Sequence, residues 1–241
     1  MCSGRVDMSF VLRAFSKGID GVFIGACHLN ECNYIANGNY HALTMVLLFR
    51  RIMEHIGLNP ERLRIRFMSG AEANIFAEST NDFVKNVKKL GPLGTGEGLD
   101  KDTLHARLAE VEKLIPYFKV AMREKLATRL ESHEDYEKYD QVFTKEEIDK
   151  LFTEVVSYWI DPEKCQACTT CFRRCPAEAI ISAKGQIHII DQDKCIKCGT
   201  CFEVCPPKFR AVTKLIGESA PPPLPEDQRA VVRKGKEKEV A

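Results

Sequence analysis

Eight cysteines in the last third of the chain fall into two runs with identical spacing. In each run two intervals of three residues are followed by one of four, and a proline comes next. The first run is Cys165, Cys168, Cys171 and Cys175, before Pro176, and the second is Cys195, Cys198, Cys201 and Cys205, before Pro206. Thiolates at this spacing are typical ligands of 4Fe–4S clusters. The runs therefore predict two such clusters and one-electron transfer.

The spacing also predicts which cysteines share a cluster. The first three thiolates of a run can wrap a tight loop around one corner of a cubane, whereas the fourth lies one helical turn further on and ligates the other cluster. We therefore assign to the first cluster Cys165, Cys168, Cys171 and Cys205. The second cluster receives Cys195, Cys198, Cys201 and Cys175. The proline after each run turns the chain away and removes a backbone donor.

Other uses of these cysteines explain the spacing less well. Structural zinc takes four ligands from paired C-x-x-C segments, which would leave the third cysteine of each run over. Disulfide frameworks suit short secreted chains, whereas this chain has 241 residues and begins without an apolar signal segment. Between the runs, 179–182 and 186–190 with Gly185 between them predict a hairpin, so 160–215 resembles a two-cluster ferredoxin. We expect His188 at an exposed strand position, because the cysteines already supply every ligand.

Charge and hydropathy exclude two classes of partner. With 35 basic and 34 acidic residues the formal net charge is +1, without the basic excess of nucleic-acid-binding proteins. The sequence contains no apolar run of the roughly 18 residues that a transmembrane helix needs. Eleven cysteines in a chain without an export signal are typical of metal binding in a reducing compartment. We therefore expect a cytoplasmic protein.

The first 92 residues alternate between helical and strand patterns. Helices are predicted over 7–17, 41–56 and 71–90, and strands over 21–26 and 62–68. The continuous apolar run at 21–26 is typical of a buried parallel strand. We therefore predict an α/β domain with a small parallel sheet.

Three further cysteines lie in this region. Cys27 and Cys32 follow the strand predicted at 21–26, and Cys2 follows what would be the end of another strand. Functional residues in such sheets gather at the carboxyl ends of the strands. The three thiols are therefore candidates for a further cluster or for redox chemistry. Cysteines also serve as small buried apolar residues, and spacing alone leaves these alternatives open.

Several blocks of residues in this region carry a family resemblance. They are Met-Cys-Ser-Gly-Arg at 1–5, Gly-Val-Phe-Ile-Gly-Ala-Cys-His at 21–28, Glu-Cys-Asn-Tyr at 31–34, Gly-Asn-Tyr at 38–40, Leu-Asn-Pro-Glu-Arg-Leu-Arg at 58–64 and Ser-Gly-Ala-Glu at 69–72. Together they resemble the FlpD/MvhD family, the delta subunit of methyl-viologen-reducing hydrogenase. The resemblance implies one 2Fe–2S cluster. It also implies an electron relay to a heterodisulfide-reductase-type flavoprotein, which in the family is the electron-bifurcating subunit.

The sequence departs from that family at its start. Family members usually begin with a strand and a Cys-Asn-Trp-Cys segment, and a second strand then leads into Cys-Ser-Gly-Arg. Here the chain starts at the second motif, so Cys2, Cys27 and Cys32 supply at most three of the four ligands of a 2Fe–2S cluster. We expect a gene model that starts late, and a missed selenocysteine codon would produce one. Supply of the missing ligand by another polypeptide and loss of the cluster are the alternatives.

The rest of the chain predicts a connector and a tail. Residues 91–98 form a turn-rich linker, and 101–131 are helical, with Pro116 expected to kink or break the helix. Thr144 and Glu147 form a capping box for a helix expected to run through Trp159 and to pack on the ferredoxin module. The predicted domains are 1–92 (delta-subunit-like, α/β, truncated at its start), 93–159 (helical connector), 160–215 (α+β, two-cluster ferredoxin) and 216–241 (Pro-rich extended tail).

These features predict an electron-transfer component of an anaerobic oxidoreductase complex, without a substrate site of its own. It would connect a heterodisulfide-reductase-A-like flavoprotein to a hydrogenase, a formate dehydrogenase or another redox enzyme. A free ferredoxin-like carrier is one alternative. A thiol-dependent enzyme using Cys27 beside His28 is another, although adjacent residues seldom orient as nucleophile and base. The Gly-rich stretch at 94–98 lacks the Lys-Ser/Thr of a phosphate-binding loop.

Overall fold

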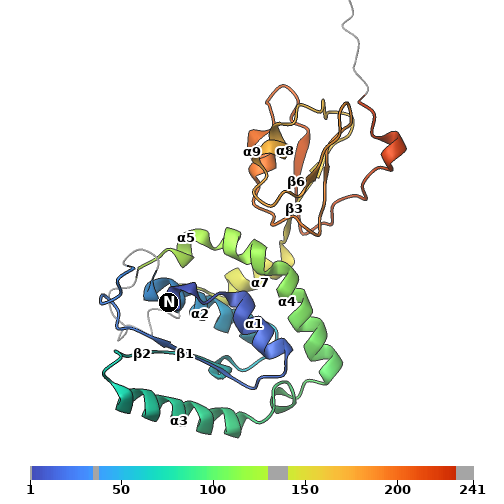
Figure 1. The fold of residues 1–241 in the computed structure, drawn as a ribbon. Helices are drawn as coiled ribbons and strands as arrows, with labels where there is room; N and C mark the ends of the chain where they lie inside the picture. The colour runs from blue at the N-terminus through green and yellow to red at the C-terminus, as the bar shows by residue number, and fades with distance from the viewer. Residues whose placement is uncertain (1, 35–37, 130–140, 232–241) are drawn as a thin grey trace, which may run out of the picture. The chain divides into compact units, whose positions relative to one another are not determined.

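The computed structural model describes residues 2–34, 38–129 and 141–231. They fall into two compact units, Met1–Leu151 and Phe152–Ala241 (Figure 1). The expected domain boundaries at 92, 159 and 215 remain predictions, because the compact units divide the chain at one place only. Within the described ranges, no helix combines the length and the apolar character needed to cross a membrane.

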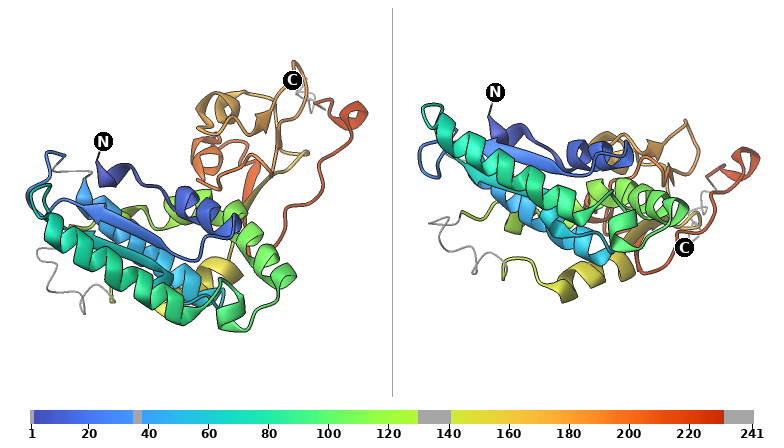
Figure 2. Two further views of the ribbon diagram at one scale, coloured as in Figure 1. Left: turned by 60° about the horizontal axis from the view of Figure 1, so that its bottom comes forward. Right: turned by 90° about the horizontal axis from the view of Figure 1, so that it is seen from below.

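The first unit is built on a two-stranded parallel sheet, as the sequence predicts. Strand β1 (Val22–Ala26) pairs with β2 (Leu63–Phe67), and Ile24 lies opposite Ile65. Helices α1 (Met8–Ser16) and α2 (Asn39–His55) lie on one side of this sheet and α3 (Ala73–Leu90) on the other (Figures 1 and 2). Because side chains alternate along a strand, Ile24 and Ala26 are buried while Phe23 reaches the ring of Phe83 on α3, 5.6 Å away between centroids.

Local sequence explains where the first helix begins and which face it buries. Asp7 caps α1, its carboxylate accepting from the backbone N–H of Ser9 at 2.9 Å. The buried side chains of α1 recur at helical spacing, namely Met8, Val11, Leu12 and Phe15. Phe15 stacks on Phe49 of α2 with 6.5 Å between ring centroids. The helix therefore packs on α2 through its apolar face.

A buried ion pair joins the start of β2 to the turn-rich segment after α3. The side chain of Arg62 is fully buried and donates to the Glu97 carboxylate, with Nε 2.5 Å from Oε1. Its remaining N–H groups donate to the backbone carbonyls of Asp20, Leu90, Gly91 and Pro92. A Cβ at Gly96 would lie 1.9 Å from the Leu90 carbonyl oxygen, so only glycine fits there. The predicted linker is thus a tightly bonded part of the first unit.

The expected break at Pro116 does not occur. Helix α4 (Lys101–Ala121) continues through this proline and is followed by the short α5 (Arg123–Leu126). An internal proline removes one helix hydrogen bond and costs about 3 kcal/mol. The buried face of α4 extends to both sides of it, with Leu104, Leu108, Val111, Ile115 and Phe118. Tertiary packing of that face therefore outweighs the local penalty. The predicted end at 131 lies outside the described residues.

The helix predicted to run from 144 to Trp159 is shorter than expected. Helix α7 (Lys145–Thr153) has the predicted capping box, since Glu147 N donates to Thr144 Oγ1 and Thr144 N donates to Glu147 Oε2. Residues Val156–Ile160 instead form strand β3, which pairs antiparallel with β6 (Val212–Ile216). These residues are rich in β-branched and aromatic types. Their partner strand lies more than 50 residues away (212 − 160 = 52), so a local helical period could not reveal it.

The second unit contains both cysteine runs. Each run leads into a short helix, α8 (Thr170–Arg174) or α9 (Thr200–Val204), and these two helices contact each other. Between the runs the predicted hairpin is confirmed, with β4 (Ile180–Ile181) paired antiparallel to β5 (Ile189–Ile190). The chain after β6 returns to this unit, because Ile187 N donates to Arg229 O at 2.8 Å. The part of the Pro-rich tail up to residue 231 therefore lies along its own unit.

Candidate iron–sulfur sites

Two cavities in the second unit are each lined by four cysteines. One is lined by Cys165, Cys168, Cys171 and Cys205, and we call it the first cradle. The other is lined by Cys195, Cys198, Cys201 and Cys175, and we call it the second cradle. Their volumes are similar, about 300 and 310 Å³. The fold thus brings together the two sets of cysteines that the sequence spacing groups, with the fourth member of each set coming from the other run.

Backbone geometry aims N–H groups at the sulfur atoms of the cradles. In the first cradle His188 N lies 3.5 Å from Cys165 Sγ, and Ala211 N lies 3.3 Å from Cys205 Sγ. In the second, Lys197 N and Ala179 N make the corresponding contacts, to Cys195 Sγ at 3.4 Å and to Cys175 Sγ at 3.3 Å. Such donors favour the thiolate form that binds iron.

The loops that carry these donors adopt a backbone conformation that is uncommon outside glycine. Ala167 and Thr169 in the first run have φ values of 51° and 62°, and Lys197 and Gly199 at the equivalent positions of the second run have 58° and 81°. Left-handed residues cost energy unless the surroundings hold them, and they gather at ligand sites. The same strained pattern in both runs indicates that the two loops are shaped for the same kind of group.

Burial affects the cysteines before any metal binds. Desolvation raises the pKa of Cys171 to about 11 and that of Cys201 to about 12, and the neighbouring cysteines act in the same direction. Metal coordination requires the thiolate, so loading these sites must release protons. Four converging cysteines, amide donors and an apolar lining are the donor set that a 4Fe–4S cluster needs, and the residues present therefore fit that group.

His188 is not exposed, contrary to the sequence-based expectation. Its exposed fraction is 1%, and its Nδ1 lies 3.4 Å from Cys171 Sγ. Burial lowers the pKa of the imidazole, so the neutral ring is favoured. The expectation failed because the hairpin that carries His188 is covered on the first-cradle side, which is a tertiary feature.

The three N-terminal cysteines also converge. Cys2 Sγ lies 3.5 Å from Cys32 Sγ, although 30 residues separate them in sequence. Cys2 caps the short 3₁₀ helix η1 (Ser3–Arg5), and Cys27 follows β1. Burial raises the pKa of Cys27, with Cys32 and Cys2 adding to the effect. Burial also acts to raise the pKa of Cys32, but the backbone N–H groups of Tyr34 and Asn39 and the neighbouring thiols outweigh it and lower the pKa.

Two residues at the start of α2 support this thiol cluster. Asn39 is fully buried, and its Nδ2 donates to the carbonyls of Cys27 and His28 at 2.7 and 2.6 Å. A Cβ at Gly38 would lie 2.3 Å from Cys32 Sγ, so this position accepts only glycine without movement. The Gly-Asn pair thus holds the loop after β1 against the helix. The family resemblance included these residues, but their structural role emerges only in the fold.

The pairing of Cys27 with His28 as nucleophile and base finds no support in the geometry. The His28 ring bonds to Glu72, with Nε2 2.7 Å from Oε2. In the described part of the chain, no hydrogen bond joins that ring to Cys27 Sγ. A raised thiol pKa also lowers the fraction of reactive thiolate. The thiol-enzyme alternative is therefore not favoured.

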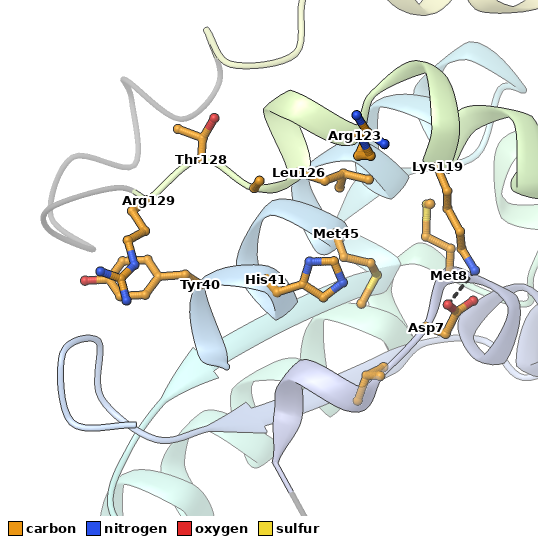
Figure 3. Close-up of a pocket in the computed structure, with 12 residues that line it drawn as sticks. Asp7, Met8, Tyr40, His41, Met45, Lys119, Arg123, Leu126, Thr128 and Arg129 are labelled. Carbon is orange, nitrogen blue, oxygen red and sulfur yellow. Dashed lines mark hydrogen bonds and ion pairs between the residues drawn. The ribbon is translucent and has the colours of Figure 1, made fainter. Parts of the chain in front are cut away.

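The first unit contains a further cavity, of about 810 Å³, which no cysteine lines (Figure 3). Its floor includes Met8 and Met45, both buried, and its rim includes Lys119 and Arg123. Lys119 Nζ bonds to the Asp7 carboxylate at 2.5 Å, as the dashed line in Figure 3 shows. The cavity has no sulfur ligands and therefore differs in chemistry from the cysteine sites.

Comparison with known proteins assigns each unit to a family. Residues 1–91 match the model for methyl-viologen-reducing hydrogenase, delta subunit, and residues 158–211 match the model for a 4Fe-4S dicluster domain. The second match begins within β3, in agreement with the strand that replaces the predicted helix end.

Curated relatives match the N-terminal part. The chain is 43% identical over 91 residues to an iron-sulfur subunit of the F420-non-reducing hydrogenase of Archaeoglobus profundus, which covers 38% of this chain and 66% of that protein. It is 39% identical over 101 residues to the vhc iron-sulfur subunit of an F420-non-reducing hydrogenase of Methanococcus voltae, covering 42% of this chain and 69% of that protein.

A third relative is much longer. The heterodisulfide-reductase-A polypeptide of the ferredoxin:CoB-CoM enzyme of Methanosarcina mazei is 38% identical over 113 residues, which covers 47% of this chain but only 14% of that protein. The chain therefore spans about two thirds of the hydrogenase iron-sulfur proteins and a small fraction of the reductase polypeptide. By its N-terminal region, the chain belongs to the family of the methyl-viologen-reducing hydrogenase delta subunit, and it carries a 4Fe–4S dicluster domain in addition.

Proposed function

We propose that the chain is the iron–sulfur electron-transfer component of an oxidoreductase complex. It relays electrons between a heterodisulfide-reductase-A-like flavoprotein and a second redox enzyme such as a hydrogenase or a formate dehydrogenase. The observation that carries this proposal is the fusion of two four-cysteine cradles to a delta-subunit domain in one chain. The 4Fe–4S cluster, when bound, supplies one-electron transfer.

The ligands proposed for the two clusters follow the cradles. Cys165, Cys168, Cys171 and Cys205 hold one 4Fe–4S cluster. Cys195, Cys198, Cys201 and Cys175 hold the other. The crossed fourth ligands tie the two sites into one folding unit, and the contact between α8 and α9 supports this exchange.

The N-terminal thiols are proposed as ligands of a 2Fe–2S cluster. Cys2, Cys27 and Cys32 supply three of the four thiolates that such a cluster takes. Two facts support a ligand role over a purely apolar one. The Cys2 and Cys32 sulfurs lie 3.5 Å apart without forming a disulfide, and backbone N–H groups lower the pKa of Cys32. Buried apolar cysteines need neither feature.

The first experiment is anaerobic purification of the full chain, with iron, acid-labile sulfide and zinc measured per polypeptide. We expect about eight irons from two cubanes, and about ten if the N-terminal thiols hold a 2Fe–2S cluster. Electron paramagnetic resonance of the dithionite-reduced protein should show two interacting clusters. Bound zinc with little sulfide would contradict the proposal.

The second experiment tests the relay. Native complexes isolated under anaerobic conditions should contain this chain together with a flavoprotein and a second redox enzyme. Rapid reduction of the clusters by the second enzyme's substrate should depend on the second unit, and substitution of Cys198 by Ser should slow it. A chain that remains monomeric and exchanges electrons only by diffusion would instead favour the free-carrier alternative.

A further inference from the structure

The two cradles are related by a repeat of 30 residues that extends beyond the cysteines (195 − 165 = 30). Ile160 and Ile190 are equivalent in this repeat, as are Asp161 and Asp191, whose carbonyls accept from Cys165 N and Cys195 N at 3.0 Å each. The equivalence places Tyr158 opposite His188, each seven residues before its run (165 − 158 = 7 and 195 − 188 = 7). Each of the two side chains lines one cradle, His188 the first and Tyr158 the second.

A second exchange in the repeat accompanies this one. A Cβ at Gly199 would lie 2.7 Å from the Tyr158 hydroxyl, so the tyrosine requires glycine at that position. The equivalent residue of the first run is Thr169, which carries a Cβ in the same left-handed conformation. The smaller imidazole thus coincides with the larger loop residue. The two cradles are built on one plan but differ in the group that faces the sulfur atoms.

The difference is chemical as well as steric. His188 faces two sulfurs of the first cradle, with Nδ1 3.4 Å from Cys171 Sγ and its backbone N 3.5 Å from Cys165 Sγ. Its Nε2 is buried and has no partner in the described part of the chain. No competing acceptor among those residues therefore holds the ring proton on Nε2. In the second cradle, no hydrogen bond among the described residues links the Tyr158 hydroxyl to a cysteine.

We propose that His188 is a tuning residue that donates a hydrogen bond from Nδ1 to Cys171 Sγ and so makes the first cluster the easier of the two to reduce. The proposal rests on the proposed function, since it requires both cradles to hold clusters. An iron-bound thiolate has no proton to give, so the ring must be the donor. A reduced cluster carries one more negative charge, and a charge-assisted hydrogen bond strengthens with that charge. Hydrogen bonds to the sulfurs are one of the determinants of cluster potential.

The consequence is a direction of electron flow within the second unit. An electron that enters this unit rests preferentially on the cluster of Cys165, Cys168, Cys171 and Cys205. We expect the equilibrium between the two clusters to favour it at least tenfold, which corresponds to about 59 mV for a one-electron couple. Without the histidine the two sites of the repeat would approach equal potentials.

The test is a pair of matched substitutions in the full chain, His188→Phe and Tyr158→Phe, each followed by an anaerobic redox titration monitored by electron paramagnetic resonance. We expect His188→Phe to lower the potential of one cluster by at least a tenfold equilibrium change. We expect Tyr158→Phe to leave both potentials within a twofold change, because its hydroxyl bonds to no sulfur. His188→Asn keeps a donor near the Nδ1 position and should recover part of the shift.

Two further measurements keep the proposal open to refutation if His188→Phe fails to assemble. The wild-type protein, labelled with ¹⁵N-histidine, should show a nitrogen hyperfine coupling at one reduced cluster, and the double substitution His188→Tyr with Thr169→Gly should copy the second cradle and equalise the potentials. Equal potentials in the wild type, or no shift in any His188 variant, would overturn the inference while leaving the proposed function intact. Failure of the wild-type chain to bind about eight irons would instead overturn the proposed function.

Discussion

The cysteines of the second unit and those of the first show two ways of building a thiolate site. In the second unit each cradle combines three cysteines of one short loop with a fourth from the equivalent loop, so local spacing and one repeat determine the arrangement. In the first unit Cys2, Cys27 and Cys32 come from separate segments, and the sheet and α2 bring them together. A site encoded in a loop can be found from sequence, whereas a site assembled by tertiary packing depends on every element beneath it.

The largest expected effect tests the crossed ligands. Substitution of Cys205 by Ser should disturb the cluster of Cys165, Cys168 and Cys171, although Cys205 belongs to the second run. We expect the bound iron of the two cubanes to fall from about eight to about four. The matched variant Cys175→Ser should disturb the other cluster. If each substitution instead removed the cluster of its own run, the crossed assignment would be wrong.

The next effect separates the two units by stability. Substitution of Arg62 by Met leaves Glu97 without its partner in a largely buried site, and breaking such a pair costs about 3–5 kcal/mol. We expect chemical denaturation to show this loss for the first unit. The spectra of the two cubanes should not change, because the pair lies in the other unit. The double variant Arg62→Met with Glu97→Met should recover much of the stability, and its failure to do so would assign the effect to the carbonyl contacts of Arg62.

A smaller effect tests the packing around the N-terminal thiols. Substitution of Gly38 by Ala introduces a Cβ 2.3 Å from Cys32 Sγ, and crowding of this kind costs about 1–3 kcal/mol. We expect a lower melting temperature and altered alkylation rates of the three thiols. Gly25→Ala is the control, because nothing lies within 4 Å of a Cβ there. Equal effects of the two variants would show that general backbone stiffening, not contact with Cys32, is responsible.

The smallest effect concerns pH. Burial alone would raise the pKa of Asp7, but the hydrogen bonds from Lys119 and Ser9 outweigh it and hold the pKa below its usual value. A carboxyl group with a depressed pKa in the folded state stabilises the protein above its unfolded pKa, and this stability is lost as the pH falls through the folded pKa. We expect about 0.2–1 kcal/mol, since the pair is partly exposed.

Asp7→Asn isolates this contribution. Asparagine still caps α1 but has no charge, so the variant should be less stable than the wild type at pH 7 and equal to it at about pH 2, where the carboxyl group is protonated. Urea denaturation at the two pH values measures the difference. A constant difference across pH would assign the loss to the cap and not to the ion pair.

Most of the elements of the first unit were predictable because their patterns are local. The apolar run at 21–26, the cap at Asp7 and the capping box at Thr144 each specify a start or a strand within a few residues. Two expectations failed where distant packing overrode local preference. Pro116 stays inside α4 because both sides of the proline bury apolar residues, and 156–160 form a strand because β6 pairs with them.

The sequence by itself determined the chemistry of the second unit, because cysteine spacing within a loop limits which groups the thiolates can hold. It also determined the alternation of helices and strands in the first unit, through periodicities that each segment carries alone. Only the tertiary structure decided what surrounds the sulfur atoms. The burial of His188 against Cys171 and the meeting of Cys2 with Cys32 depend on contacts between residues far apart in the chain. Spacing cannot encode such contacts, since they arise when separate elements pack together.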